Sequence, residues 1–172
     1  MGKIAIVGIH STADIMTNSS NEMFIGNCRK AKKKIEKMMS DIILGGCGDG
    51  LSVHRGPRSL LKLLRENEIT DISFVLRRFI PRDVDIDEPP TLKTAWSCLP
   101  EDREMDPLDR WNVGIEESNR MWGEVERWFE ENDALLREHI KQFVVVIMSD
   151  KLAFHVRDDV EDMLNAVSFY IG

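Results

Sequence analysis

Phe143-Val144-Val145-Val146-Ile147-Met148 is an unbroken apolar run in which four of the six side chains are branched at Cβ. Branched side chains favour extended backbone, and a short continuous apolar run is typical of a strand that is covered on both faces. We therefore predict that residues 143–148 form a central strand, around which the rest of the fold packs.

The segment after this strand is predicted to turn and then to close the fold. Ser149-Asp150-Lys151 is polar and is expected to turn the chain, after which residues 152–156 return as a strand. Asp158 is a favourable N-cap and predicts a closing helix. The inward positions of that helix are expected to be Val160, Met163, Leu164 and Val167.

The longest helical pattern precedes the central strand and begins at Asp106. Gly114 is expected to break or bend its start, so one continuous helix is predicted over residues 116–141. The apolar stripe is too broad for a simple coiled coil and favours core packing, but contact of Trp122 and Trp128 with another subunit is the alternative. The stripe repeats every seven residues, at Leu108, Ile115, Trp122, Phe129, Leu136 and Phe143.

A long connection without apolar periodicity, residues 81–107, comes before this helix. It contains five prolines and many acidic residues, so we expect an irregular arm. Loops of this length in a compact domain are usually functional, or are ordered by a partner. Trp96 lies within the arm and suits an interface anchor as well as a core position.

Two shorter helices are predicted before the arm. Gly56-Pro57 favours the start of the first, because proline is tolerated in the first turn of a helix. Thr70 or Asp71 is placed to cap the second, and Pro81 would stop it. Residues 69–76 form a strand in the alternative interpretation, since so short an apolar run is ambiguous.

The glycine-rich run at residues 45–50 does not fit a phosphate-binding loop. It lacks the Gly-Lys-Ser/Thr ending, it follows a predicted helix rather than opening one, and Asp49 would repel phosphate. We predict a turn or a helix C-cap here, and no cofactor.

A basic helix is predicted just before this run, with Asn27 as its N-cap. The lysines of residues 29–37 lie opposite an apolar face, where they form either a solvated surface or an electrostatic contact with protein or phosphate. No aromatic residue is interleaved, so contact with nucleic acid beyond electrostatics is not expected. The interface candidates on this helix are Lys30, Lys32, Lys33 and Lys34.

The N-terminal stretch is predicted to form a strand, a turn and a second strand. Residues 3–9 are rich in branched apolar residues, and residues 23–25 are apolar again. The polar cluster between them, Thr17-Asn18-Ser19-Ser20-Asn21, favours a turn, although loops on a rigid scaffold also carry functional sites.

The stretch Asp14-Ile15-Met16-Thr17-Asn18-Ser19-Ser20-Asn21-Glu22-Met23-Phe24-Ile25 resembles a signature near the N-terminus of many uncharacterised proteins of tailed bacteriophages, notably crAss-like phages, and of some bacteria. The shared pattern is an acidic residue or glycine, two apolar residues, Thr or Ser, Asn-Ser-Ser, and then Phe with an aliphatic residue. The resemblance implies a phage setting, but no common activity and no catalytic residue. Its signature residues are Asp14, Thr17, Asn18, Ser19, Ser20, Glu22 and Phe24.

Together these patterns predict an α+β fold in one domain over residues 1–172, with three to four strands and about five helices, one of them long. The three cysteines are widely spaced, which fits no disulfide framework and suits a reducing cytoplasm. No apolar run is long enough for a bilayer span and no signal peptide is recognisable, so the expected location is a virion or the host cytoplasm.

The net charge of −7 conceals an asymmetry along the chain. Residues 1–58 carry nine Lys or Arg against five Asp or Glu, whereas the remainder carries fourteen against twenty-five. An acidic chain is not a general nucleic-acid binder, and the asymmetry suits head-to-tail packing of copies.

No catalytic constellation in the sequence is convincing. His10 and Asp14 with Ser19 or Ser20 make only a nominal Ser-His-Asp set, and no Gly-x-Ser-x-Gly turn supports it. The four histidines lack Cys or carboxylate partners at ligand spacing, so no metal site is expected.

The function expected first is therefore that of a non-enzymatic, phage-encoded virion component, such as a ring, connector or auxiliary head or tail protein. Its partners would be further copies of the chain or other virion proteins. The first alternative is a small intracellular phage protein that binds and inhibits or redirects a host protein. The second is a hydrolase-like enzyme that uses the loop from Asp14 to Glu22.

Overall fold

The computed structural model describes residues 21–27, 37, 48–102 and 104–171 of the 172-residue chain. Within these residues it contains five α-helices, one of them long, and a four-stranded antiparallel sheet, so the predicted α+β class is confirmed. The chain divides into two compact units, here named the sheet unit (Met1–Arg55 with Ile140–Gly172) and the helical unit (Gly56–His139).

The sheet unit is built on four strands in the order β2-β3-β1-β4, and each neighbouring pair is antiparallel. The predicted strand at residues 143–148 is β3, which pairs on both sides, and the predicted short strand at 23–25 is the centre of β1. The four strands are β1 (Asn21–Asn27), β2 (Gly48–His54), β3 (Phe143–Ser149) and β4 (Ala166–Ile171).

The end of the chain folds differently from the prediction. Helix α6 spans Asp150–Leu164, so residues 150–156 are helical where a turn and a strand were expected. The predicted closing helix is confirmed as far as Leu164, with Val160 and Leu164 buried, but Val167 belongs to strand β4. Asp158 therefore lies inside a helix and caps nothing. Asn165 has φ of 48°, a left-handed conformation that asparagine tolerates and that ends the helix.

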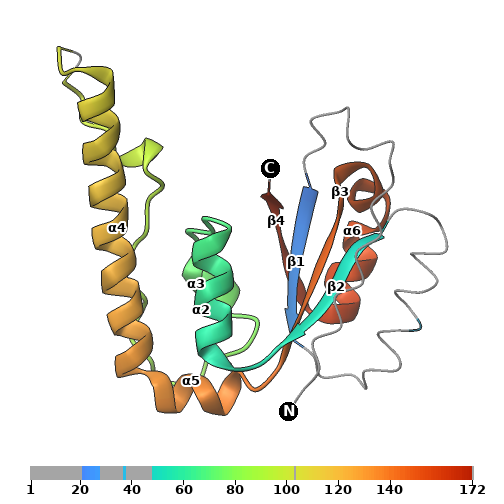
Figure 1. The fold of residues 1–172 in the computed structure, drawn as a ribbon. Coiled ribbons are helices and arrows are strands. Elements are labelled where there is room, and N and C mark those ends of the chain that lie inside the picture. The colour runs from blue at the N-terminus through green and yellow to red at the C-terminus, as the bar shows by residue number, and fades with distance from the viewer. Residues whose placement is uncertain (1–20, 28–36, 38–47, 103, 172) are drawn as a thin grey trace. The chain divides into compact units, whose positions relative to one another are not determined.

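Helix α6 packs on one face of the sheet and forms the core of this unit with it (Figure 1). The packing is closest at Gly26 of β1. A Cβ atom there would lie 2.7 Å from the Cβ of Leu164 and 2.8 Å from its carbonyl oxygen, so only glycine lets the helix end approach the strand. The buried cluster comprises Phe24, Val144, Val146, Met148, Ala153, Val160, Leu164 and Ala166.

The helical unit contains α2 (Gly56–Glu66), α3 (Ile72–Leu76), the 3-10 turn η2 (Trp96–Cys98), α4 (Pro107–Glu131) and α5 (Asp133–His139). Asp71 caps α3, because its Oδ1 accepts a hydrogen bond from the Phe74 backbone N–H at 3.1 Å. The helix predicted there is thus confirmed, and the alternative strand at residues 69–76 is wrong.

The long helix begins at the start of the helical pattern, earlier than the predicted helix over residues 116–141, and it is interrupted elsewhere. Asp106 Oδ1 accepts a hydrogen bond from the Leu108 N–H at 2.9 Å and caps α4. Gly114 lies inside α4 and neither breaks nor delays it. The predicted continuity to residue 141 is wrong instead, because α4 ends at Glu131, with Asn132 as its C-cap, before α5 begins at Asp133.

The glycine-rich run also needs a correction where it is described. Gly48 to Gly50 begin strand β2, with a register shift against β3, rather than forming a turn or a helix C-cap. The predicted strand at residues 3–9, residues 17–20 of the predicted polar turn and the basic helix lie outside the described residues, except for Lys37. The last residue of that predicted turn, Asn21, is instead the first residue of strand β1. Among the helices of the described residues, none combines the length and the apolar character needed to cross a membrane.

Candidate interaction surface on the arm and the long helix

The Pro-rich arm, residues 81–106, runs beside α4 toward the N-terminus of that helix (Figure 1). Side chains of α4 hold it through the arm's backbone carbonyls. Ser118 Oγ donates to the Lys93 carbonyl at 3.2 Å, and Arg110 Nε donates to the Pro100 carbonyl at 2.6 Å. The arm is therefore an ordered part of the helical unit. Among its described residues, η2 is the only helical or strand element.

Gly114 lies between these two attachment points and explains how the arm approaches the helix so closely. A Cβ atom on Gly114 would lie 2.6 Å from the Ala95 carbonyl oxygen and 3.0 Å from Leu99 Cδ2. Any other residue would have to push the arm outward. Residues 110, 114 and 118 share one face of an α-helix, so this face is occupied by the arm.

The neighbouring face of α4 carries apolar side chains that remain exposed. Trp96 of the arm is 73% exposed, and its ring lies 4.9 Å from the Trp111 ring, centre to centre. Leu108 and Ile115, spaced to flank Trp111 on one helix face, are 66% and 36% exposed. We name these four residues, Trp96, Leu108, Trp111 and Ile115, the apolar patch.

The charged residues close in sequence to the apolar patch are mostly acidic. Exposed carboxylates in the arm and at the start of α4 include Asp102, Glu104, Asp106, Asp109 and Glu116. A partner that covered the patch would therefore be favoured by basic groups around its own apolar contact.

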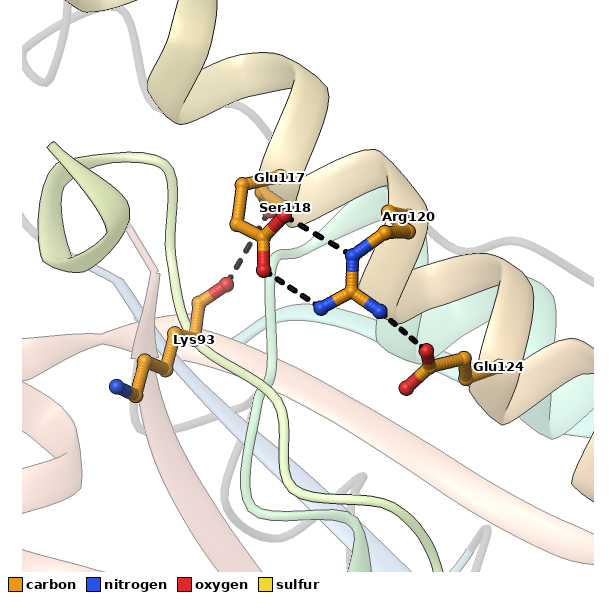
Figure 2. A network of polar contacts seen from close by, with 5 residues as sticks. All are labelled: Lys93, Glu117, Ser118, Arg120 and Glu124. Atoms are coloured by element: carbon orange, nitrogen blue, oxygen red, sulfur yellow. Dashed lines mark hydrogen bonds and ion pairs between the residues drawn. The ribbon is translucent and has the colours of Figure 1, made fainter. Parts of the chain in front are cut away.

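Figure 2 shows a polar network on α4 beside the Lys93–Ser118 attachment. Arg120 donates to Glu117 through Nη2 at 2.6 Å and through Nε at 3.0 Å, and its Nη1 bonds Glu124. The hydrogen bond from Arg120 holds the pKa of Glu117 below its ordinary value. In turn, the hydrogen bond to Glu117 raises the pKa of Arg120. The network keeps one arginine engaged with its own helix.

The predicted tryptophan candidates separate into two kinds. Trp122 and Trp128 are 5% and 7% exposed and pack inside the helical unit, which is the core interpretation of the stripe. Trp96 is largely exposed. Trp111 was not predicted as part of an interaction surface. The exposure of Leu108 and Ile115 was missed because the seven-residue repeat placed them on one stripe with the buried Trp122 and Phe129.

Of the signature residues, Glu22 and Phe24 are described, and both serve the fold. Phe24 is fully buried in the core cluster of the sheet unit. Glu22 is also buried, and its Oε2 accepts a hydrogen bond from Arg157 Nη2 at 2.9 Å, while Nε lies 2.8 Å from Oε1. The Glu22 and Tyr170 contacts raise the pKa of Arg157. This ion pair fastens α6 to β1.

The other predicted residues lie outside the described part of the chain. They are Asp14, Thr17, Asn18, Ser19 and Ser20 of the signature and Lys30, Lys32, Lys33 and Lys34 of the basic segment.

Comparisons of the chain with models of protein families, with curated proteins and with solved structures found no match. The described residues contain no group of three or more His, Cys, Asp or Glu side chains arranged to hold a metal ion.

Proposed function

We propose that this protein is a non-enzymatic virion component of a phage that acts through protein–protein contacts, and that the apolar patch binds a second copy of the chain. The observation that carries the contact is the exposure of Trp96 beside Trp111, Leu108 and Ile115. Contiguous apolar surface with a polar rim is typical of interaction sites, and tryptophan is enriched among residues that dominate binding energy.

A second copy is the favoured partner because the chain carries both an acidic region and a basic segment that could pair with it. The apolar patch lies among carboxylates of the arm and of α4. The sequence of residues 29–37 supplies six Lys or Arg in nine positions. Complementary charges in different segments of one chain promote head-to-tail association, which closes into rings or extends into filaments.

The virion setting is supported by the resemblance of the stretch from Asp14 to Ile25 to proteins of tailed phages. Rings, connectors and auxiliary head or tail proteins are assembled from repeated copies, so self-association and this setting fit one role. Mass spectrometry of purified phage particles tests the setting directly, because a structural component would be present in many copies.

Light scattering of the untagged protein over a concentration series tests the contact. The monomer has a mass of 19.8 kDa, and we expect the weight-average mass to rise well above this value with concentration. The double variant Trp96→Ser, Leu108→Ser is expected to stay near the monomer mass. High salt should weaken the association of the unchanged protein, because exposed charges are screened.

Phe154→Ser provides the matched control. Phe154 is 78% exposed, but it belongs to α6 of the sheet unit, so its replacement should leave the oligomer unchanged. A double variant that associates as strongly as the unchanged protein would contradict the role of the apolar patch. A monomer at every concentration would contradict self-association altogether.

A further inference from the structure

The helical unit contains a second candidate site, a pocket of about 430 Å³ that is separate from the apolar patch. Its floor consists of Leu76, Ile80 and Trp128, which are all at least nine-tenths buried. Its outer wall is the first part of the arm, including the half-buried Val84 and Ile86. This volume lies in the lower part of the range typical of small-molecule sites, roughly 300–1,000 Å³.

The chain builds this pocket by folding the arm back at the end of α3. Pro81 follows α3 closely, and the Val84 N–H donates to the Pro81 carbonyl at 3.2 Å in a tight turn. An ion pair then ties the arm to the helix end, with Arg77 Nη2 lying 3.8 Å from Glu88 Oε1. Both partners line the pocket, so the ion pair forms part of its rim.

The remaining charges on the rim are one cation and one anion. Arg82 and Asp87 line the pocket and are exposed, and neither has an ion-pair or hydrogen-bond partner within the part of the chain that the structure describes. A ligand with a single negative charge would satisfy Arg82 but would leave Asp87 beside it. A purely apolar ligand would use neither group.

We infer that the pocket binds a small zwitterion with an apolar body, which is the chemistry of a free apolar α-amino acid or of a short apolar peptide. The carboxylate pairs with Arg82 and the ammonium group with Asp87, while the side chain packs on Ile80 and Trp128. Charge-assisted hydrogen bonds fix the orientation of the ligand, and apolar contact supplies most of the affinity.

Nuclear magnetic resonance of the ¹⁵N-labelled full chain tests this site with L-phenylalanine as the probe. The indole N–H signal of Trp128 and the amide signals of residues 82–88 should shift saturably. Phenethylamine lacks the carboxylate and 3-phenylpropionate lacks the ammonium group, so each should bind about two to five times more weakly, the loss expected for a partly exposed ion pair. The dipeptide Phe-Phe distinguishes the two sources, because tighter binding than L-phenylalanine identifies a peptide.

Two substitutions assign the charges. Arg82→Gln should lower the affinity for L-phenylalanine to that for phenethylamine, and it should leave the affinity for phenethylamine unchanged. Asp87→Asn should lower the affinity for L-phenylalanine to that for 3-phenylpropionate. The matched controls are Arg127→Gln and Asp83→Asn, which replace exposed neighbours that do not line the pocket.

Three results would overturn the inference. The first is the absence of any saturable shift with L-phenylalanine and with Phe-Phe. The second is equal affinity for L-phenylalanine and both single-charge analogues. The third is an unchanged affinity for L-phenylalanine in both pocket variants, since binding would then depend on neither charge.

Discussion

The two halves of α4 carry the same sequence pattern but end in different environments. Leu108, Ile115, Trp122 and Phe129 follow one another at seven-residue intervals, and their side chains are 66%, 36%, 5% and 4% exposed. The pattern determines that these side chains point in one direction. It does not determine whether another element lies there to cover them.

The covering elements explain the difference. Helices α2 and α5 contact α4, and the Arg65–Glu126 ion pair places α2 at its C-terminal half, where Trp122 and Phe129 are buried. The N-terminal half packs against the arm and η2, and this contact uses the adjacent face at Gly114. One half therefore stabilises the unit, whereas the other half presents an apolar surface.

The largest expected effect is a difference in stability between a variant in the C-terminal half of α4 and a variant in its N-terminal half. Phe129→Ala should lower the free energy of unfolding by about 3–5 kcal/mol, because it removes a buried ring and leaves a cavity. Leu108→Ala should change it by less than about 0.5 kcal/mol, since that side chain is mostly in water already. Urea unfolding followed by tryptophan fluorescence is the suitable measurement, because all four tryptophans belong to the helical unit.

Equal losses for the two variants would contradict this comparison. A large loss for Leu108→Ala at high protein concentration only would instead show that the residue is buried between copies. The measurement should therefore be repeated at two protein concentrations.

The next effect concerns the two glycines of α4. Gly114→Ala should cost about 1–3 kcal/mol and loosen the arm, because the new methyl group would meet the Ala95 carbonyl at 2.6 Å. Gly123→Ala meets nothing within 4 Å, so it should stabilise the helix by about 0.5–1 kcal/mol. Opposite signs in urea unfolding are the expected result, and a gain for both variants would show that the arm does not press on Gly114.

Local patterns predicted most of the elements that local chemistry determines. The apolar run forms β3, Asp71 is one of the two residues predicted to cap α3, and Asp106 stands where the long helical pattern begins. The errors arose where a short segment was ambiguous. Residues 152–156 fit either period, and pairing of β4 with β1 was needed to show that the chain ends in a strand.

The candidate surface was less predictable than the fold. An irregular arm was expected, but the sequence left Trp96 open between an interface anchor and a core position, and its partner Trp111 depends on how the arm lies along α4. Gly114 was interpreted as a helix breaker because glycine in the interior of a helix is less favourable than other residues. Its actual use, close approach of a distant carbonyl, depends on a contact nineteen residues away in sequence. The pocket was not predicted either, because its rim residues Arg77, Arg82, Asp87 and Glu88 form no recognisable sequence motif.

A smaller effect is expected at the ring contact of the apolar patch. Trp96→Ala removes the contact with Trp111, which is worth about 0.5–1.5 kcal/mol for an aromatic pair beyond its burial. We expect a loss of about 1 kcal/mol or less in the monomer, together with the loss of self-association. Circular dichroism and light scattering on the same sample separate these outcomes, and a variant that unfolds would show that Trp96 belongs to the core.

The smallest effect is expected at Glu117, where the attachment of the arm adjoins the network of Arg120. The pKa of this carboxylate is lowered in the folded chain, so the ion pair stabilises the protein above the unfolded pKa of Glu, about 4.3. That contribution is lost as the pH falls through the lowered, folded pKa. Glu117→Gln should thus differ slightly from the unchanged protein at pH 7 and not at pH 3 in urea unfolding. The effect is small because both side chains are exposed and screened by solvent. Glu116→Gln, which changes a neighbouring exposed carboxylate, is the matched control, and an equal response in both variants would indicate general surface charge instead of this network.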